Sequence, residues 1–139
     1  MLHMVKLAVG IRDIAHLREV QKLRASVRPP LRHQTRSTPR RADELTDGGS
    51  IYWVIAGAVV VRQRILDVIE DRWDDDTGCA GLVLDPELVP VHATPMRAFQ
   101  GWRYLTADAA PPDLSAGTAP TTTDMPVEMR RQLQSLGLL

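Results

Sequence analysis

The chain has 139 residues, of which 44% are hydrophobic, and its 17 basic residues balance its 17 acidic residues. This length is typical of one domain that buries a core without metal or disulfide staples. The longest apolar run, residues 51–61, is far shorter than the roughly 18 residues of a membrane-spanning helix. Residues 1–9 also lack the continuous apolar stretch of a signal peptide, which predicts a cytoplasmic protein.

The charges are segregated along the chain although they cancel in total. Residues 1–64 hold 12 Lys or Arg against 5 Asp or Glu, whereas residues 65–139 hold 5 against 12. This asymmetry predicts a basic face and an acidic face. Most of the cations are arginines, a bias that a GC-rich genome also produces, so only local arginine clusters count as evidence of a site.

The first third of the chain predicts a strand, a helix and a second strand. Residues 3–9 alternate polar and apolar side chains up to Gly10, the pattern of a strand. Asp13 is suited to cap a following helix that ends before Pro29 and Pro30. Residues 31–36 are polar enough for an exposed strand. The apolar face of the helix is predicted to consist of Leu17, Val20, Leu23 and Val27.

A second, shorter helix is predicted between Thr38 and the pair Gly48-Gly49. The threonine hydroxyl can cap its first turn, and Pro39 suits the first helical position. The next segment, residues 51–55, is β-branched or aromatic throughout, as in a strand that is buried on both faces. Gly57 marks a bend before another strand at residues 59–68.

The remaining segments predict further strands and a terminal helix. A polar turn at residues 74–78 joins a strand at residues 79–84 to the preceding strand as a hairpin. Residues 88–92 are a further candidate strand, and residues 97–105 hold an aromatic cluster. We expect a domain over residues 1–114, a linker over 115–124 and a helix over 125–139 that docks on the domain or on a partner.

Several blocks together resemble an uncharacterised bacterial family catalogued as domain of unknown function 1489. They comprise residues 5–10, 38–45, 48–55, 62–66, 84–86, 99–105 and 136–139, so they span nearly the full length. The most specific are the Gly-Gly-Ser block that ends at Ile55 and the block from Phe99 to Leu105. This resemblance implies a family and no activity.

The order of elements also resembles the PUA, ASCH and EVE group of small β-barrels. A polar strand, a short helix, a double glycine and a strand containing Tyr52-Trp53 follow one another in that order. The resemblance implies an α+β fold, with a small mixed or antiparallel β-barrel or a strongly curved sheet and flanking helices. It also implies binding of RNA or modified bases. Some ASCH enzymes use a lysine near the threonine, but here Arg32 precedes Thr35, and a guanidinium cannot act as a base.

The start of the second helix is the best candidate for anion binding. Arg40 and Arg41 occupy a first turn whose partial positive charge disfavours cations, and a bound phosphate would account for their position. The alternative is that both arginines pair with Asp43 or Glu44 in solvent. The full set of candidate anion- or nucleic-acid-binding residues is His33, Arg36, Thr38, Arg40, Arg41, Arg62, Arg64 and Arg103.

The aromatic residues Trp53, Trp102 and Tyr104 are candidates for stacking against a base. The alternative is that they fill the core, because the chain has only one phenylalanine. No metal or cofactor is predicted, since the four histidines lack metal-ligand spacing. The run Asp74–Asp76 lacks the bidentate glutamate of a calcium loop. No catalytic arrangement follows from the spacing of the residues.

These observations leave three hypotheses for function. The first is a non-enzymatic module of PUA-like type that binds RNA or a nucleotide through the arginines named above. The second is a protein-interaction or homo-oligomerising subunit that uses the C-terminal helix. The third is a small-molecule enzyme with a pocket near Trp102.

Overall fold

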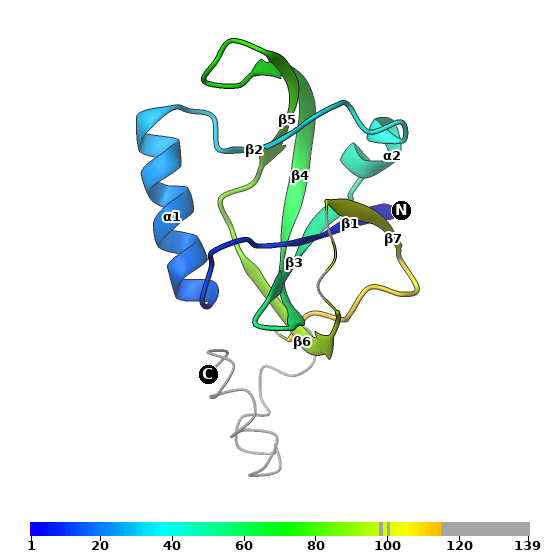
Figure 1. Ribbon diagram of the computed structural model, residues 1–139. Helices are drawn as coiled ribbons and strands as arrows, with labels where there is room; N and C mark the ends of the chain where they lie inside the picture. Colours follow the sequence, from blue (N-terminus) through cyan, green and yellow to red (C-terminus); the bar gives the residue numbers. More distant parts are fainter. Residues whose placement is uncertain (98, 100, 115–139) are drawn as a thin grey trace, which may run out of the picture.

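The computed structural model describes residues 1–97, 99 and 101–114 (Figure 1). The predicted linker and C-terminal helix lie outside these residues. Two helices and seven strands follow one another along the described chain. They are β1 (Leu2–Leu7), α1 (Ile14–Val27), β2 (Arg32–Thr35), α2 (Ala42–Thr46), β3 (Ser50–Ile55), β4 (Ala58–Arg72), β5 (Gly78–Leu84), β6 (Val89–Pro95) and β7 (Trp102–Thr106).

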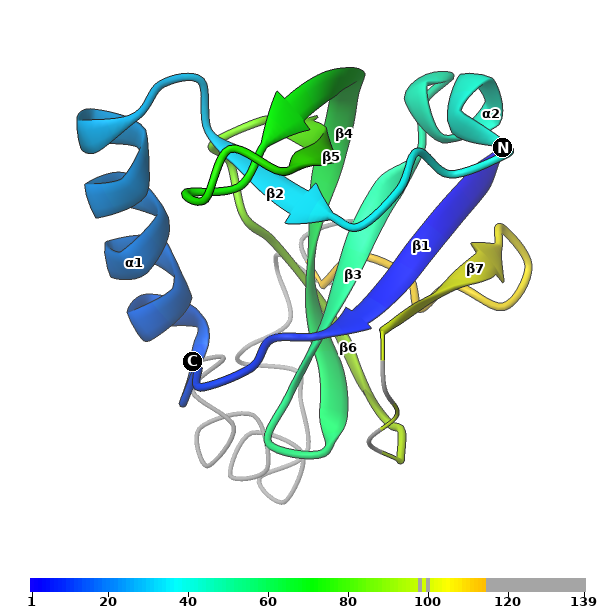
Figure 2. The same ribbon diagram turned by 45° about the horizontal axis from the view of Figure 1, so that its top comes forward.

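The strands form one mixed sheet in the order β2-β5-β4-β3-β1-β7, and β6 pairs with β4 outside this path. Strand β1 runs parallel to β3, and the other pairs are antiparallel. The sheet curls through 186° into a half-barrel, so β2 and β7 are its two edges. Helix α1 flanks the sheet, and α2 lies beside the N-terminal end of β1 (Figure 2). The predicted α+β fold with a strongly curved mixed sheet is confirmed.

Helix α1 begins as the sequence predicts, but it buries a different face. The Asp13 carboxylate accepts a hydrogen bond from the backbone N–H of His16 at 2.7 Å. The buried stripe consists of Ile14, Leu17 and Gln21. Leu23 and Val27 are 66% and 70% exposed, so the predicted apolar face was wrong in its second half. A glutamine replaces the expected apolar residue because it has amide partners in the interior, which are described below.

Helix α2 begins three residues later than predicted and is shorter. Arg41 occupies the N-cap position without a side-chain hydrogen bond, and residues 39–42 form a turn in which the Pro39 carbonyl accepts from the Ala42 N–H at 3.3 Å. Thr38 is therefore not the cap. The helix does end before the double glycine. A side chain at Gly49 would collide with the carbonyl oxygens of Leu2 and Leu45, which explains glycine at this close approach.

The central hairpins match the predicted pattern. All six residues of β3 are buried. The turn to β4 has positive φ angles at Ala56 (52°) and Gly57 (82°), the geometry of a tight hairpin turn. Strand β4 continues for 15 residues and pairs first with β3 and then with β5 across the polar turn at residues 74–78. The predicted hairpin is confirmed.

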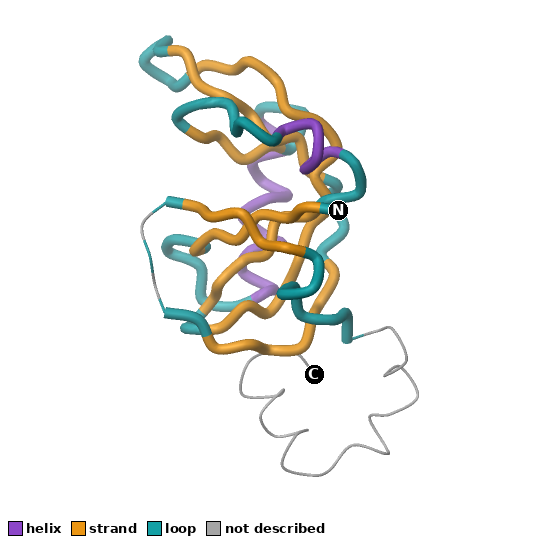
Figure 3. Tube along the Cα trace, turned by 90° about the vertical axis from the view of Figure 1, so that its right-hand side faces the viewer, coloured by secondary structure: helices purple, strands orange, loops and turns teal. Residues whose placement is uncertain are grey.

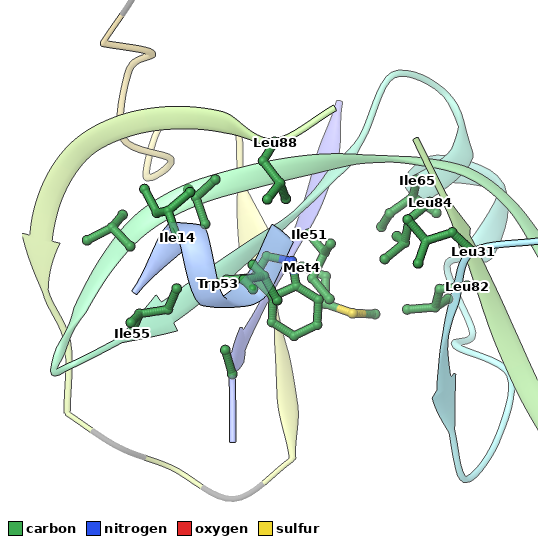
Figure 4. Packing of buried hydrophobic residues seen from close by; sticks show 14 of the residues in the cluster. Met4, Ile14, Leu31, Ile51, Trp53, Ile55, Ile65, Leu82, Leu84 and Leu88 are labelled. Atoms are coloured by element: carbon green, nitrogen blue, oxygen red, sulfur yellow. The ribbon is translucent and has the colours of Figure 1, made fainter. Parts of the chain in front are cut away.

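The curled sheet buries side chains on both faces. The inner face, which α1 and α2 cover, holds the larger cluster, including Met4, Ile51, Trp53, Ile65 and Leu82 (Figure 4). The outer face holds a smaller cluster around Tyr52, Val59 and Val91, on the side of β6. Figure 3 shows the curl of the strands from the side. Because alternate residues of β1 face opposite sides, Met4 and Lys6 point inward while His3 and Val5 point outward.

Candidate functional site

In the turn before α2, the groups of Arg41 that were predicted to bind an anion are engaged with other residues. The Arg41 guanidinium pairs with both carboxylate oxygens of Glu44, with Nη2 2.8 Å from Oε1. The backbone N–H of Arg41 donates to the Tyr104 hydroxyl at 3.0 Å. The guanidinium and the backbone N–H of Arg41, which a phosphate would need, are thus both engaged. The pairing with Glu44 is the alternative that the sequence left open. Arg40 remains exposed, without an ion pair to any described carboxylate.

An aromatic pair lies at the β7 edge next to this turn. Trp102 and Tyr104 pack edge to face with ring centroids 4.9 Å apart, and both are half-buried on the inner face. The Arg41 guanidinium carbon lies 5.6 Å from the centroid of the Tyr104 ring. The structure therefore brings together Arg41, Trp102 and Tyr104 from the predicted set.

Trp53 is not available for base stacking. It is only 4% exposed, and its indole N–H donates to the Gln63 side-chain oxygen at 3.1 Å. Its ring packs edge to face against His33 at a centroid distance of 5.3 Å. The stacking hypothesis is therefore wrong for Trp53, whose role is that of a core residue.

Three of the predicted arginines lie on the outer face, away from the β7 aromatic pair. Arg62 binds the Asp113 carboxylate through two hydrogen bonds of 2.7 Å and also donates to the Ser50 hydroxyl. Arg64 is exposed two residues further along β4. The Arg103 guanidinium carbon lies 4.6 Å from the centroid of the Phe99 ring. These three residues do not share a site with Arg41.

Arg36 and Thr38 line a broad hollow at the end of β2. The hollow has a volume of about 730 Å³, and its wall also contains Arg28 and Arg72. Glu70 and Asp71 lie in the same wall. This volume falls within the range of small-molecule sites. The segment 36–41 leads from this hollow to the turn before α2.

A smaller cavity, here called the inner cavity, lies between α1 and the strands β1, β2 and β3. Its volume is about 140 Å³. Apolar side chains form most of its wall, and the polar groups in it are Lys6, Gln21, Arg24, Arg32 and His33. Arg32 is already paired with Asp71, which also accepts a hydrogen bond from Gln34. Among the described residues, no acidic side chain lines the cavity.

Lys6 and His33 are the unusual groups in this wall. Burial lowers the pKa of Lys6, and within the described part of the chain no carboxylate is paired with it. His33 Nε2 is a buried polar atom without a hydrogen-bond partner among the described residues. Burial, followed by the charges of Lys6 and Arg24, lowers the pKa of His33 to about 4. The imidazole is therefore neutral near pH 7.

The family of the chain follows from comparison with known proteins. The family model "Protein of unknown function (DUF1489)" matches residues 4–139. The chain belongs to this family. A search of curated proteins and a search of solved structures each gave no significant match. The curled sheet is compatible with a small barrel-like fold, as the second resemblance implies.

Neither α1 nor α2 is long and apolar enough to cross a membrane. Within residues 1–97, 99 and 101–114, no group of three or more His, Cys, Asp or Glu side chains is placed to hold a metal ion.

The sequence pattern did not single out Lys6 or Arg24, and it grouped His33 with Arg36 beside the turn at Thr38. One signal was present: Leu2, Met4, Lys6 and Ala8 share one face of β1, and Lys6 is the only charged residue among them. A lysine on an otherwise apolar strand face is costly to bury without a partner. The partner elements of that face, however, come from α1 and β2, and the pattern of β1 does not identify them.

Proposed function

We propose that the protein is a non-enzymatic binding module for single-stranded RNA or a nucleotide. In this proposal the ligand lies along the open side of the half-barrel, the side between its edge strands β2 and β7. The observation that carries the proposal is the aromatic pair Trp102–Tyr104 on edge strand β7, with a guanidinium against its tyrosine ring. Half-buried aromatic rings beside cations are a common platform for unstacked bases.

The cations next to this pair support the same path. Arg40 precedes the turn at Arg41 and is exposed, and Arg36 lies in the hollow at the other end of the same segment. Phosphates bound along this segment would place a base against Trp102. The outer-face residues Arg62 and Arg103 have other contacts and take no part in the proposal.

The test is the affinity for a short single-stranded RNA of mixed sequence, measured by fluorescence anisotropy at increasing salt concentration. Affinity is expected to fall as salt rises, because phosphate contacts release counterions. Arg40→Ala should make the slope of log affinity against log salt shallower by about 0.7, the value for one phosphate contact on a single strand. Arg64→Ala is the matched control, since Arg64 is also exposed but lies on the outer face.

Trp102→Leu separates base stacking from packing, because leucine keeps an apolar side chain against the core but offers no flat ring. We expect a loss of about 1 to 3 kcal/mol in binding, the usual contribution of one stacked base. Undetectable or salt-independent binding would refute the proposal. Equal losses in the Arg40 and Arg64 variants would refute the proposed location.

A further inference from the structure

The inner cavity is too small for a nucleotide but has room for one small charged group. Its volume of about 140 Å³ corresponds to roughly four or five waters, whereas sites for drug-sized molecules begin at about 300 Å³. Its wall comes from α1, β1, β2, the loop between β1 and α1, and single residues of β3 and β5, so several elements of the fold shape it.

The wall carries uncompensated positive charge. Lys6 and Arg24 contribute positive charge, and Arg32 is neutralised by Asp71. In the described ranges, neither Lys6 nor Arg24 has an ion-pair partner. A partly buried ammonium without a counter-charge is unfavourable, because burial removes water and nothing replaces it. An anion in the cavity would remove this cost.

His33 adds a hydrogen-bond donor of defined chemistry. Its Nε2 is buried without a partner, and its neighbours keep the ring neutral near pH 7. A neutral imidazole can carry its single proton on Nε2 and donate it to an oxygen atom. The imidazole ring packs edge to face against Trp53, which restricts its rotation.

We propose that the inner cavity is an oxyanion site, in which Lys6 and Arg24 supply the charge and His33 Nε2–H donates a hydrogen bond, and that its ligand is a phosphate group. This inference goes beyond the proposed function, because the cavity would bind a free phosphate whether or not the open side binds RNA. A carboxylate shares the same chemistry, and the experiment distinguishes the two.

The experiment measures thermal unfolding of the full chain against millimolar inorganic phosphate, with potassium chloride keeping the ionic strength constant. A ligand that binds only the native state raises the melting temperature. The wild type is expected to be stabilised by phosphate, and acetate replaces phosphate in a second series. Stabilisation by acetate alone would assign the site to a carboxylate and overturn the choice of phosphate.

The chain offers a matched control because it has two lysines, Lys6 and Lys22, and Lys22 is exposed on α1. Lys6→Met should weaken phosphate binding by about tenfold or more, as expected for loss of a charged hydrogen bond. Lys22→Met should bind as the wild type does. His33→Leu should also weaken binding, by a smaller factor, because it removes a neutral donor.

A second readout does not depend on the stability of a variant. An amine-reactive reagent is applied to the wild type, and labelling at each lysine is measured by mass spectrometry. Phosphate should protect Lys6 and leave Lys22 unchanged. Equal protection of both lysines would show non-specific binding of phosphate and would overturn the proposal. No protection and no stabilisation would show that the cavity holds water only, and would also overturn it. Because no RNA is present, this result stands apart from the RNA-binding test.

Discussion

Two polar clusters lie on the inner face of the half-barrel, both against α1, and they differ in how far their hydrogen bonds are satisfied. In the first, here called the amide network, the side chains of Gln21 and Gln63 bond to each other at 2.8 and 2.6 Å. Gln63 also accepts from the Trp53 indole and donates to the Asp85 carbonyl. In the second, His33 Nε2 has no partner among the described residues.

In the oxyanion proposal, the difference separates polar groups that stabilise the fold from polar groups that bind a ligand. Gln63 is fully buried, yet each polar atom of its side chain is bonded, as is usual for buried polar groups in folded proteins. Lys6 and His33 line the inner cavity on the same face of the sheet. Among the described residues, Lys6 lacks an ion-pair partner and His33 Nε2 lacks a hydrogen-bond partner. A buried polar group that is left incomplete beside a complete one points to a ligand that supplies the missing partner.

The largest expected effect comes from breaking the complete cluster. Gln63→Leu leaves the Trp53 indole N–H, the Asp85 carbonyl and the Gln21 amide without their bonds. Each unsatisfied group costs about 1 to 3 kcal/mol, so we expect a loss of about 4 kcal/mol in the free energy of unfolding. Urea denaturation measures it. A loss below about 1 kcal/mol would mean that water replaces the network and that the comparison with His33 fails.

The second effect concerns pH and the incomplete cluster. The pKa of His33 is lowered from 6.5 to about 4 in the folded protein, so between these values the unfolded chain binds more protons than the folded one. Stability is therefore fully present above pH 6.5 and falls as the pH drops toward 4, by up to about 3 kcal/mol.

His33→Leu removes this dependence, and the difference between the two unfolding curves isolates it. Asp71 and Asp113, whose pKa values are lowered by Arg32 and Arg62, are common to both proteins and cancel. Lys6 and Arg24, the cations that face His33, are also unchanged. Parallel curves for the wild type and the variant over this pH range would contradict the buried, neutral state of His33.

The smallest effect has the opposite sign. Lys6→Met removes an unpaired, partly buried charge and keeps the apolar part of the side chain, so it should stabilise the protein by about 0.5 to 1 kcal/mol in a buffer without phosphate. Binding residues are often unfavourable for folding in this way. The measurement is urea denaturation in chloride buffer. A clear loss of stability would mean that Lys6 has a structural partner.

Much of the fold was predictable because local patterns determine it. The cap at Asp13, the buried strand at residues 50–55 and the hairpin across residues 74–78 each depend on neighbours in sequence. The face of α1 was not predictable in the same way. Gln21 is polar in sequence but buried, because Gln63, distant in the chain, satisfies its amide.

The candidate site was predicted only in part. Arg41 and Tyr104 were singled out separately and are joined in the structure, but Glu44 already neutralises the arginine. The inner cavity escaped prediction because its charged groups come from three separate elements and none of them forms a motif. A single alternating strand indicates that Lys6 faces inward, but it does not indicate what lies opposite.

Among the described strands, β4 stands midway along the hydrogen-bonded path that joins the two walls of the inner cavity. Lys6 stands on β1, two strands from β4 in one direction, and His33 stands on β2, two strands away in the other. The curl of β4 includes a register shift between Ile65 and Asp67, a feature that bends a strand. The spacing between Lys6 and His33 therefore depends on the bend in β4, a strand that carries neither residue. Straightening this bend would move β1 and β2 apart without changing any side chain that lines the cavity.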